Sequence, residues 1–147
     1  MKQKLLFLIA VLGFSFVNVQ SANAEVEVEV EAQMHEKVVK TLDVFHFEVE
    51  QSQTKNERLK KFESLKQNLT YVVQSLSEDV SLSLKEVNSL MNFSHLLVSL
   101  NLYQITPESC AHAHEQLNQK TANFKTIEIE EARRVVKKIC VNLDELN

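Results

Sequence analysis

The fold is decided by TPESCAHAHEQLNQKTANFKTIEIEEARRVVKKICVNL, residues 106–143, which contains the only two cysteines, Cys110 and Cys140. It opens with Thr106-Pro107, a capping residue followed by a proline suited to the first helical position. The helical pattern breaks and resumes around Lys125. If the chain folds back there, the cysteines lie at nearly the same height, because each helical residue adds about 1.5 Å. The sequence predicts an antiparallel helical hairpin closed by a disulfide.

The N-terminus has the three parts of a secretory signal peptide. Lys2 and Lys4 precede the apolar run Leu5–Val17, and Ala22-Asn23-Ala24 provides a cleavage site. The alternative, a membrane anchor, would need an apolar run of about 20 residues. We therefore expect residues 1–24 to be removed, leaving a protein of the periplasm that is not inserted in the membrane. In that oxidising compartment the two cysteines are expected to pair.

The composition predicts one helical domain, residues 25–147. The signal takes two lysines and no acids, so 14 basic and 20 acidic residues remain and the net charge changes from −4 to −6. This charge disfavours nucleic acid and anionic membranes as partners. The only glycine, Gly13, leaves with the signal, which excludes P-loop and Rossmann phosphate-binding loops. We expect an all-α fold, a four- to five-helix antiparallel bundle with one disulfide.

Apolar residues recur every three or four positions, which is the period of a helix buried on one face. The first two stripes are Met34, Val38, Leu42, Phe45 and Val49, then Leu59, Phe62, Leu65, Leu69, Val72 and Leu76. Residues 54–57 form a capping box before the second stripe. A third helix, starting near Ser77, is apolar nearly all round up to Leu102, so we expect it to be the most buried. The last two helices have thin stripes. The alternation in residues 25–31 is compatible with a tail, a helix start or a strand.

The histidines offer few candidate sites. His112 and His114 lie about 200° apart on a helix and cannot chelate one ion, so we expect surface histidines. A single Asp43 and His46 pair falls short of the two Glu-x-x-His segments of a di-metal bundle. His95 aligns with the apolar residues of the third helix, which predicts a core histidine or, alternatively, a ligand for a bound group. We predict no metal site.

The order of helices resembles the cytochrome b562 family, periplasmic four-helix bundles that hold haem without a covalent bond. Met34 corresponds to that family's methionine ligand, and residues 115–124 resemble its last helix. The family's histidine ligand would follow Phe124, where this chain has Lys125. The resemblance implies either a relative without haem or one that uses His35 or His95 as the replacement ligand.

No serine or cysteine lies beside a base in a catalytic pattern, and Cys-x-x-Cys-His, the covalent haem motif, is absent from the sequence. The sequence therefore favours a non-enzymatic periplasmic bundle with a binding or structural role, with an unknown protein or small ligand as partner and no cofactor. The alternative is an electron-transfer protein that binds b-type haem through Met34 with His35 or His95. A helical enzyme or enzyme inhibitor is a third reading.

Overall fold

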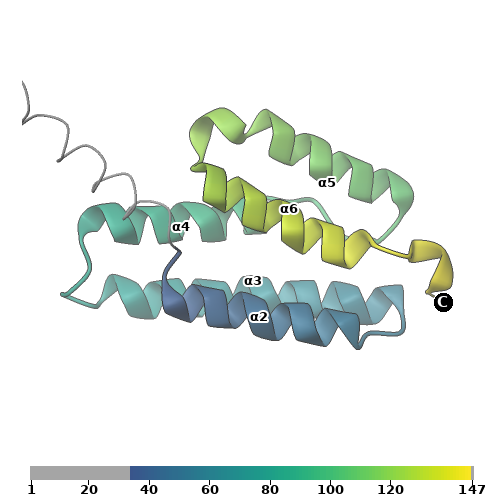
Figure 1. Ribbon diagram of the computed structural model, residues 1–147, viewed down its shortest axis with the longest axis horizontal. Coiled ribbons are helices and arrows are strands. Elements are labelled where there is room, and N and C mark those ends of the chain that lie inside the picture. The colour runs from purple at the N-terminus through teal and green to yellow at the C-terminus, as the bar shows by residue number, and fades with distance from the viewer. Residues whose placement is uncertain (1–33, 147) are drawn as a thin grey trace, which may run out of the picture. The chain divides into compact units, whose positions relative to one another are not determined.

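The computed structural model describes residues 34–146, and within them every regular element is helical (Figure 1). The elements are α2 (Glu36–Glu50), α3 (Lys55–Ser77), α4 (Leu84–Val98), α5 (Pro107–Gln119) and α6 (Thr126–Cys140), with two short 3₁₀ turns, η1 (Thr121–Asn123) and η2 (Leu143–Glu145). The all-α prediction is confirmed. The expected signal peptide and the alternating segment 25–31 lie outside the described residues. No helix within residues 34–146 is long and apolar enough to cross a membrane.

Side-chain caps fix where the helices begin. The Thr54 hydroxyl accepts from the Glu57 N–H at 3.1 Å, which confirms Thr54 as the cap of α3. The reciprocal half of the predicted capping box is absent, because the Glu57 carboxylate accepts from the Gln53 N–H at 2.8 Å instead of from the Thr54 N–H. Thr106 caps α5, with Pro107 at its first position. The predicted start of the third helix near Ser77 is wrong, because α4 starts at Leu84. Ser83 and Glu86 form the capping box there, whereas residues 78–82 turn between α3 and α4.

Four of the helices form a bundle around one core. α3 packs against α2 and α4, and α6 packs against the same two helices from the other side, so that the ring α2–α3–α4–α6 closes; α6 also contacts α3. The short connections make α2 and α4 both antiparallel to α3 (Figure 1). α5 packs on α6, outside the ring. α6 therefore completes the bundle, and α5 covers α6 from outside the ring.

The prediction that the third helix is the most buried is wrong. Leu84, Met91 and Val98 of α4 are 83%, 40% and 51% exposed. Among the described residues α4 packs mainly on α3 and α6, and these three apolar side chains meet solvent. α6 instead contacts all four other α-helices, and its buried residues are Glu128, Ile129, Ala132, Val135, Val136 and Ile139. Its apolar face is therefore not the thin one that the sequence suggested.

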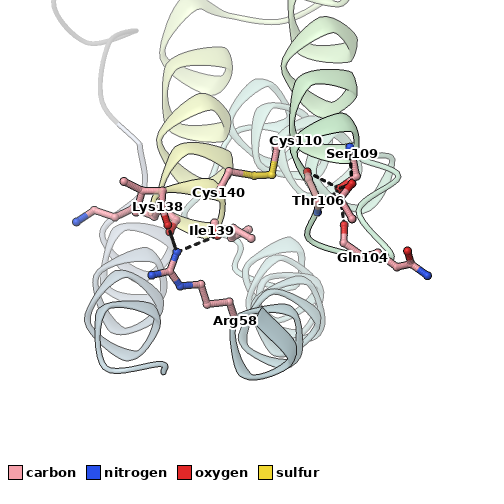
Figure 2. Close-up of a disulfide and its surroundings, with 9 residues drawn as sticks. Arg58, Gln104, Thr106, Ser109, Cys110, Lys138, Ile139 and Cys140 are labelled. Atoms are coloured by element: carbon pink, nitrogen blue, oxygen red, sulfur yellow. Dashed lines mark hydrogen bonds between the residues drawn. A yellow bond between two sulfur atoms is a disulfide. The ribbon is translucent and has the colours of Figure 1, made fainter. Parts of the chain in front are cut away.

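The predicted disulfide is confirmed. Cys110 near the start of α5 and Cys140 at the end of α6 are bonded, with their Cα atoms 6.0 Å apart (Figure 2). The bond joins residues separated by 30 positions. It holds the outer helix α5 to the helix that completes the bundle.

A buried arginine lies beside the disulfide. Arg58 in the first turn of α3 is 7% exposed, and its Nη1 donates to the main-chain carbonyl oxygen of Ile139 at 3.1 Å (Figure 2). The same nitrogen donates to the carbonyl oxygen of Val141 just after α6. Carbonyl groups in the last turn of a helix have no partner within it and form the negative end of its dipole. Arg58 thus ties the start of α3 to the end of α6.

Candidate functional site

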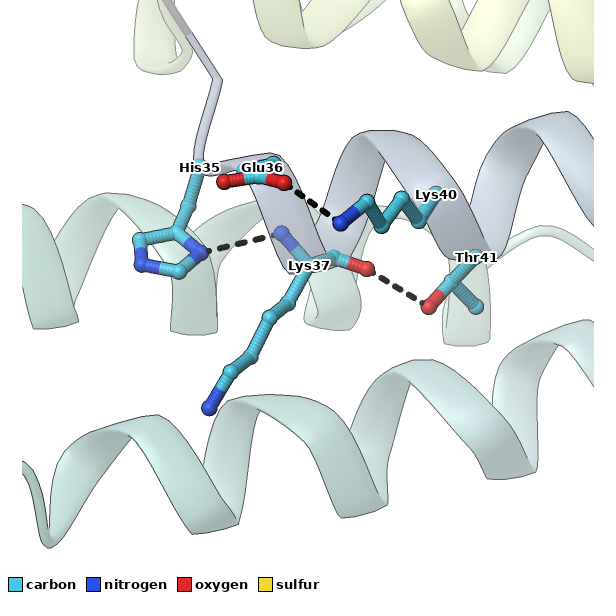
Figure 3. A network of polar contacts seen from close by, with 5 residues as sticks. All are labelled: His35, Glu36, Lys37, Lys40 and Thr41. Atoms are coloured by element: carbon cyan, nitrogen blue, oxygen red, sulfur yellow. Dashed lines mark hydrogen bonds and ion pairs between the residues drawn. The ribbon is translucent and has the colours of Figure 1, made fainter.

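The structure separates the residues proposed as haem ligands. Met34 precedes α2 and is half-buried against the core. His35 is the N-cap of α2, and its Nδ1 accepts from the Lys37 N–H at 3.2 Å (Figure 3). His95 is exposed in the last turn of α4, so its expected place in the core is wrong. It lies on the same side of α4 as the exposed Met91 and Val98, which are four residues before it and three after it.

These side chains do not converge on one position. The pKa of Glu86 is lowered, mainly by hydrogen bonds from Ser83 and also by the charge of His35, which places His35 near the start of α4. His95 lies nine residues further along α4, about 13 Å at the helical rise. Between the helices, the core contains the buried rings of Phe45, Phe62 and Phe93. These rings belong to one continuous hydrophobic core.

The other histidines are not gathered into a site either. His112 is exposed and His114 is half-buried on α5. Residues 34–146 contain no group of three or more histidine, cysteine, aspartate or glutamate side chains placed to hold a metal ion. His46 lies on the side of α2 that faces α6, with its ring 5.4 Å from that of Phe45. Both of its ring nitrogens are buried without a hydrogen-bond partner.

Because of this environment, the contribution of His46 to stability is expected to depend on pH. Burial lowers its pKa from the ordinary 6.5, and the positive charges of Lys138 and Arg134 on α6 lower it further, whereas Asp43 and Glu50 raise it. The unfolded chain, with the ordinary pKa, therefore takes up a proton that the folded chain resists. The contribution of His46 to stability is complete above about pH 6.5 and decreases as the pH falls below that value.

We expect chemical denaturation of the wild type to show a loss of stability between about pH 7 and pH 5 that is smaller in His46→Gln. The comparison uses the slope of unfolding free energy against pH, because the substitution also changes packing against Phe45. Parallel slopes for the two proteins would contradict a role for His46 in acid sensitivity.

The strongest candidate for a functional site is a polar pocket of about 410 Å³ between α4 and the start of α6, which we call the α4–α6 pocket. Its lining residues are Lys85, Asn88, Ser89 and Asn92 of α4, Asn123 of η1, and Lys125 and Glu128 at the start of α6. All seven side chains are polar or charged. Asn88 and Asn92 lie one helical turn apart and are exposed, so their carboxamides are accessible to a ligand.

Glu128 lies at the base of the pocket and is only 3% exposed. One carboxylate oxygen accepts from the Lys125 main-chain N–H at 3.0 Å, as part of the cap of α6, and the other accepts from the Ser89 hydroxyl at 2.6 Å. Both of these donors are neutral groups. Hydrogen bonds to both oxygens offset part of the cost of burying the carboxylate.

A second groove, of about 320 Å³, lies between α2 and α3. Its lining combines apolar side chains such as Val44 and Val72 with the ion pair of Lys61 and Glu48, 3.3 Å apart. It contains no buried charged group that would orient a ligand. We therefore regard the α4–α6 pocket as the better candidate.

Sequence reasoning missed this pocket. The sequence singles out Lys125 as the turn of the C-terminal hairpin and as the position where the resemblance to the cytochrome b562 family breaks, but it does not indicate a pocket there. A weak signal was present, because Lys85, Ser89 and Asn92 recur at helical spacing on one side of α4. The sequence does not show that the start of α6 lies opposite them.

The fold and the pocket define a helical bundle with one disulfide and a polar cavity. Comparison with protein-family models, characterised proteins and solved structures finds no match to this chain. Any function is therefore argued from the residues themselves.

Proposed function

We propose that this chain is a non-enzymatic binding protein of the bacterial periplasm that holds a small polar ligand in the α4–α6 pocket. One observation carries the proposal: the seven side chains that line this pocket are all polar or charged, and they include the Glu128 carboxylate, which is 3% exposed. A concave lining made only of polar groups supports a binding role better than a purely structural one.

The chemistry of the lining supports binding rather than catalysis. Glu128 is its only acid, and the hydrogen bond from the Lys125 N–H commits this carboxylate to the cap of α6. The lining contains no histidine or cysteine. General acid–base catalysis needs a group of tuned pKa within reach of a substrate proton, usually with a second group that orients it.

Two features support the periplasmic location. The N-terminal sequence has the three parts of a secretory signal. The Cys110–Cys140 disulfide is of the kind that persists in oxidising compartments and is rare in reducing ones.

The haem-binding alternative has weaker support. A distant relationship to the cytochrome b562 family agrees with a helical bundle and with Met34 at the start of the first described helix. His35 caps α2, and His95 is exposed in the last turn of α4. A role in which the ligand occupies the α4–α6 pocket does not depend on these residues.

The proposal is tested by nuclear magnetic resonance of ¹⁵N-labelled protein while small polar metabolites are added in pools. We expect shifts in the side-chain amide signals of Asn88, Asn92 and Asn123, and their loss in Asn92→Leu. Asn56→Leu, which changes an exposed asparagine in the first turn of α3, is the matched control and should bind normally.

Addition of haemin to the same protein distinguishes the alternative. We expect no sharp Soret band. A Soret band that is lost in Met34→Ala, together with pools that leave the pocket signals unchanged, would overturn the proposal in favour of haem binding.

A further inference from the structure

We propose that two copies of this chain pair through α4, which lies antiparallel against α4 of the second copy. The contact surface is the α4 stripe, which we define as the exposed apolar side chains of Leu84, Met91 and Val98. Contiguous apolar side chains that meet solvent are typical of protein interaction sites. This pairing is a property separate from ligand binding in the α4–α6 pocket and does not depend on it.

The spacing of the α4 stripe is that of helices that pair side by side. Leu84, Met91 and Val98 follow one another at intervals of seven residues, and this period keeps a line of side chains on one side of a helix. Val87, three residues after Leu84, is half-buried and adds an apolar side chain at the intermediate position of the first repeat. α4 therefore has the pattern of a short helix-pairing seam on a side that meets solvent.

The α4 stripe also lies in an uncharged part of the chain. Residues 87–107 contain no aspartate, glutamate, lysine or arginine, although these make up 24% of the sequence, and the charged residues of α4, Lys85 and Glu86, belong to its first turn. The centres of protein interfaces are depleted in charge and enriched in methionine and aromatic residues, such as Met91 and the exposed Tyr103 beyond α4. An uncharged surface suits an equally uncharged partner, and the same surface of a second copy is one.

A two-fold axis through Met91 makes the α4 stripe complementary to itself. Leu84 and Val98 are each seven residues from Met91, which is about 10.5 Å along the helix. Two antiparallel copies therefore place Met91 against Met91, and Leu84 of one copy against Val98 of the other, as a symmetric dimer interface requires. The antiparallel direction is favoured because it brings the positive end of each helix dipole beside the negative end of the other.

The size of the contact predicts a weak dimer. α4 has 15 residues, so it is about 22 Å long, and a helix with its side chains is about 10 Å wide. A contact along α4 alone covers less of each copy than the roughly 800 Å² of a standard stable interface. We expect a reversible dimer with a Kd of about 10–100 µM.

Sedimentation equilibrium of the mature protein, residues 25–147, tests the pairing. Between about 5 and 500 µM the average mass should rise from that of one chain towards that of two. Met91→Glu places two like charges at the axis and should weaken the dimer at least about tenfold. Val44→Glu adds the same charge at an exposed position of α2 and should dimerise like the wild type. Melting curves show whether the variants fold, and Val98→Glu replaces Met91→Glu if that variant does not.

Cross-linking tests the antiparallel direction. Cys110 and Cys140 are bonded to each other, so a cysteine introduced in α4 is the free thiol of the described chain. Under mild oxidation Met91→Cys should form a disulfide-linked dimer, because residues on a two-fold axis meet their own copies within the reach of a disulfide. Leu84→Cys should not link to itself, but a mixture of Leu84→Cys and Val98→Cys should form a mixed dimer.

Three results would overturn the proposal. A wild type that stays monomeric up to about 500 µM would leave a different protein as the occupant of the α4 stripe. Equal weakening by Met91→Glu and Val44→Glu would place the contact elsewhere on the molecule. Efficient linking of Leu84→Cys to itself, without a mixed dimer with Val98→Cys, would show a parallel pair instead of the antiparallel one.

Discussion

Replacement of both Cys110 and Cys140 by alanine is expected to lower the free energy of unfolding by about 3–4 kcal/mol. The disulfide joins residues 30 positions apart, so it removes much of the conformational freedom of the unfolded chain between them. α5 depends on it because this helix lies outside the four-helix ring and packs mainly on α6. A loss of this size lowers the melting temperature by about 10 °C or more in a domain of this length.

Denaturant titration of the oxidised wild type and the double variant measures the effect. Alanine is chosen because Cys110 is buried and a serine hydroxyl there would need a partner. The wild type treated with a thiol reductant provides a second route to the same state and should match the variant, which itself should not respond to the reductant. A difference below about 1 kcal/mol would contradict the prediction.

Arg58→Ala is expected to lower the free energy of unfolding by about 2–3 kcal/mol, because hydrogen bonds from a charged donor are stronger than neutral ones. The change leaves the carbonyl oxygens of Ile139 and Val141 without their buried donor. Lys60→Ala is the matched control, since it removes an exposed cation from the same helix. We expect the control to change stability by less than about 0.5 kcal/mol, and equal losses in the two variants would refute the role of Arg58.

Arg58 and the disulfide are also expected to be coupled. Both hold the end of α6, because Arg58 binds the carbonyl group of Ile139 and the next residue is Cys140. Once the disulfide is removed, the last turn of α6 is free to fray and Arg58 has less to stabilise. A double-mutant cycle should therefore give a total loss that differs from the sum of the separate losses by about 0.5 kcal/mol or more.

The helices were predictable because their causes are local. The apolar stripe from Val38 to Val49 is buried as expected. Thr54 and Thr106 cap α3 and α5, which begin where the sequence predicts. The predicted start of the third helix near Ser77 is wrong because two segments that resemble helix caps lie close together in the sequence. Ser77 ends α3, and the complete capping box is the one formed by Ser83 and Glu86.

Arg58 illustrates what periodicity leaves out. It precedes Phe62 by four residues, so it lies on the buried stripe of α3, but a charge at that position gives no indication of its partner. Its partners are more than 80 residues away at the end of α6. Hydrophobic patterns identify the helix faces that must be buried. The partner of a buried polar side chain depends instead on which helix end lies next to it in the folded structure.

By itself, the sequence determined the helical class, most helix positions and the Cys110–Cys140 pairing, because capping, periodicity and the spacing around one turn act within a helix or a hairpin. Only the tertiary structure decided that α6 closes the bundle and α5 lies outside it. That choice exposes His95 and one face of α4, and it brings Glu128 against Ser89 to form the α4–α6 pocket. The physical reason is that several apolar helix faces can pair in more than one arrangement, and the neighbours of each face are fixed only when the whole core is packed.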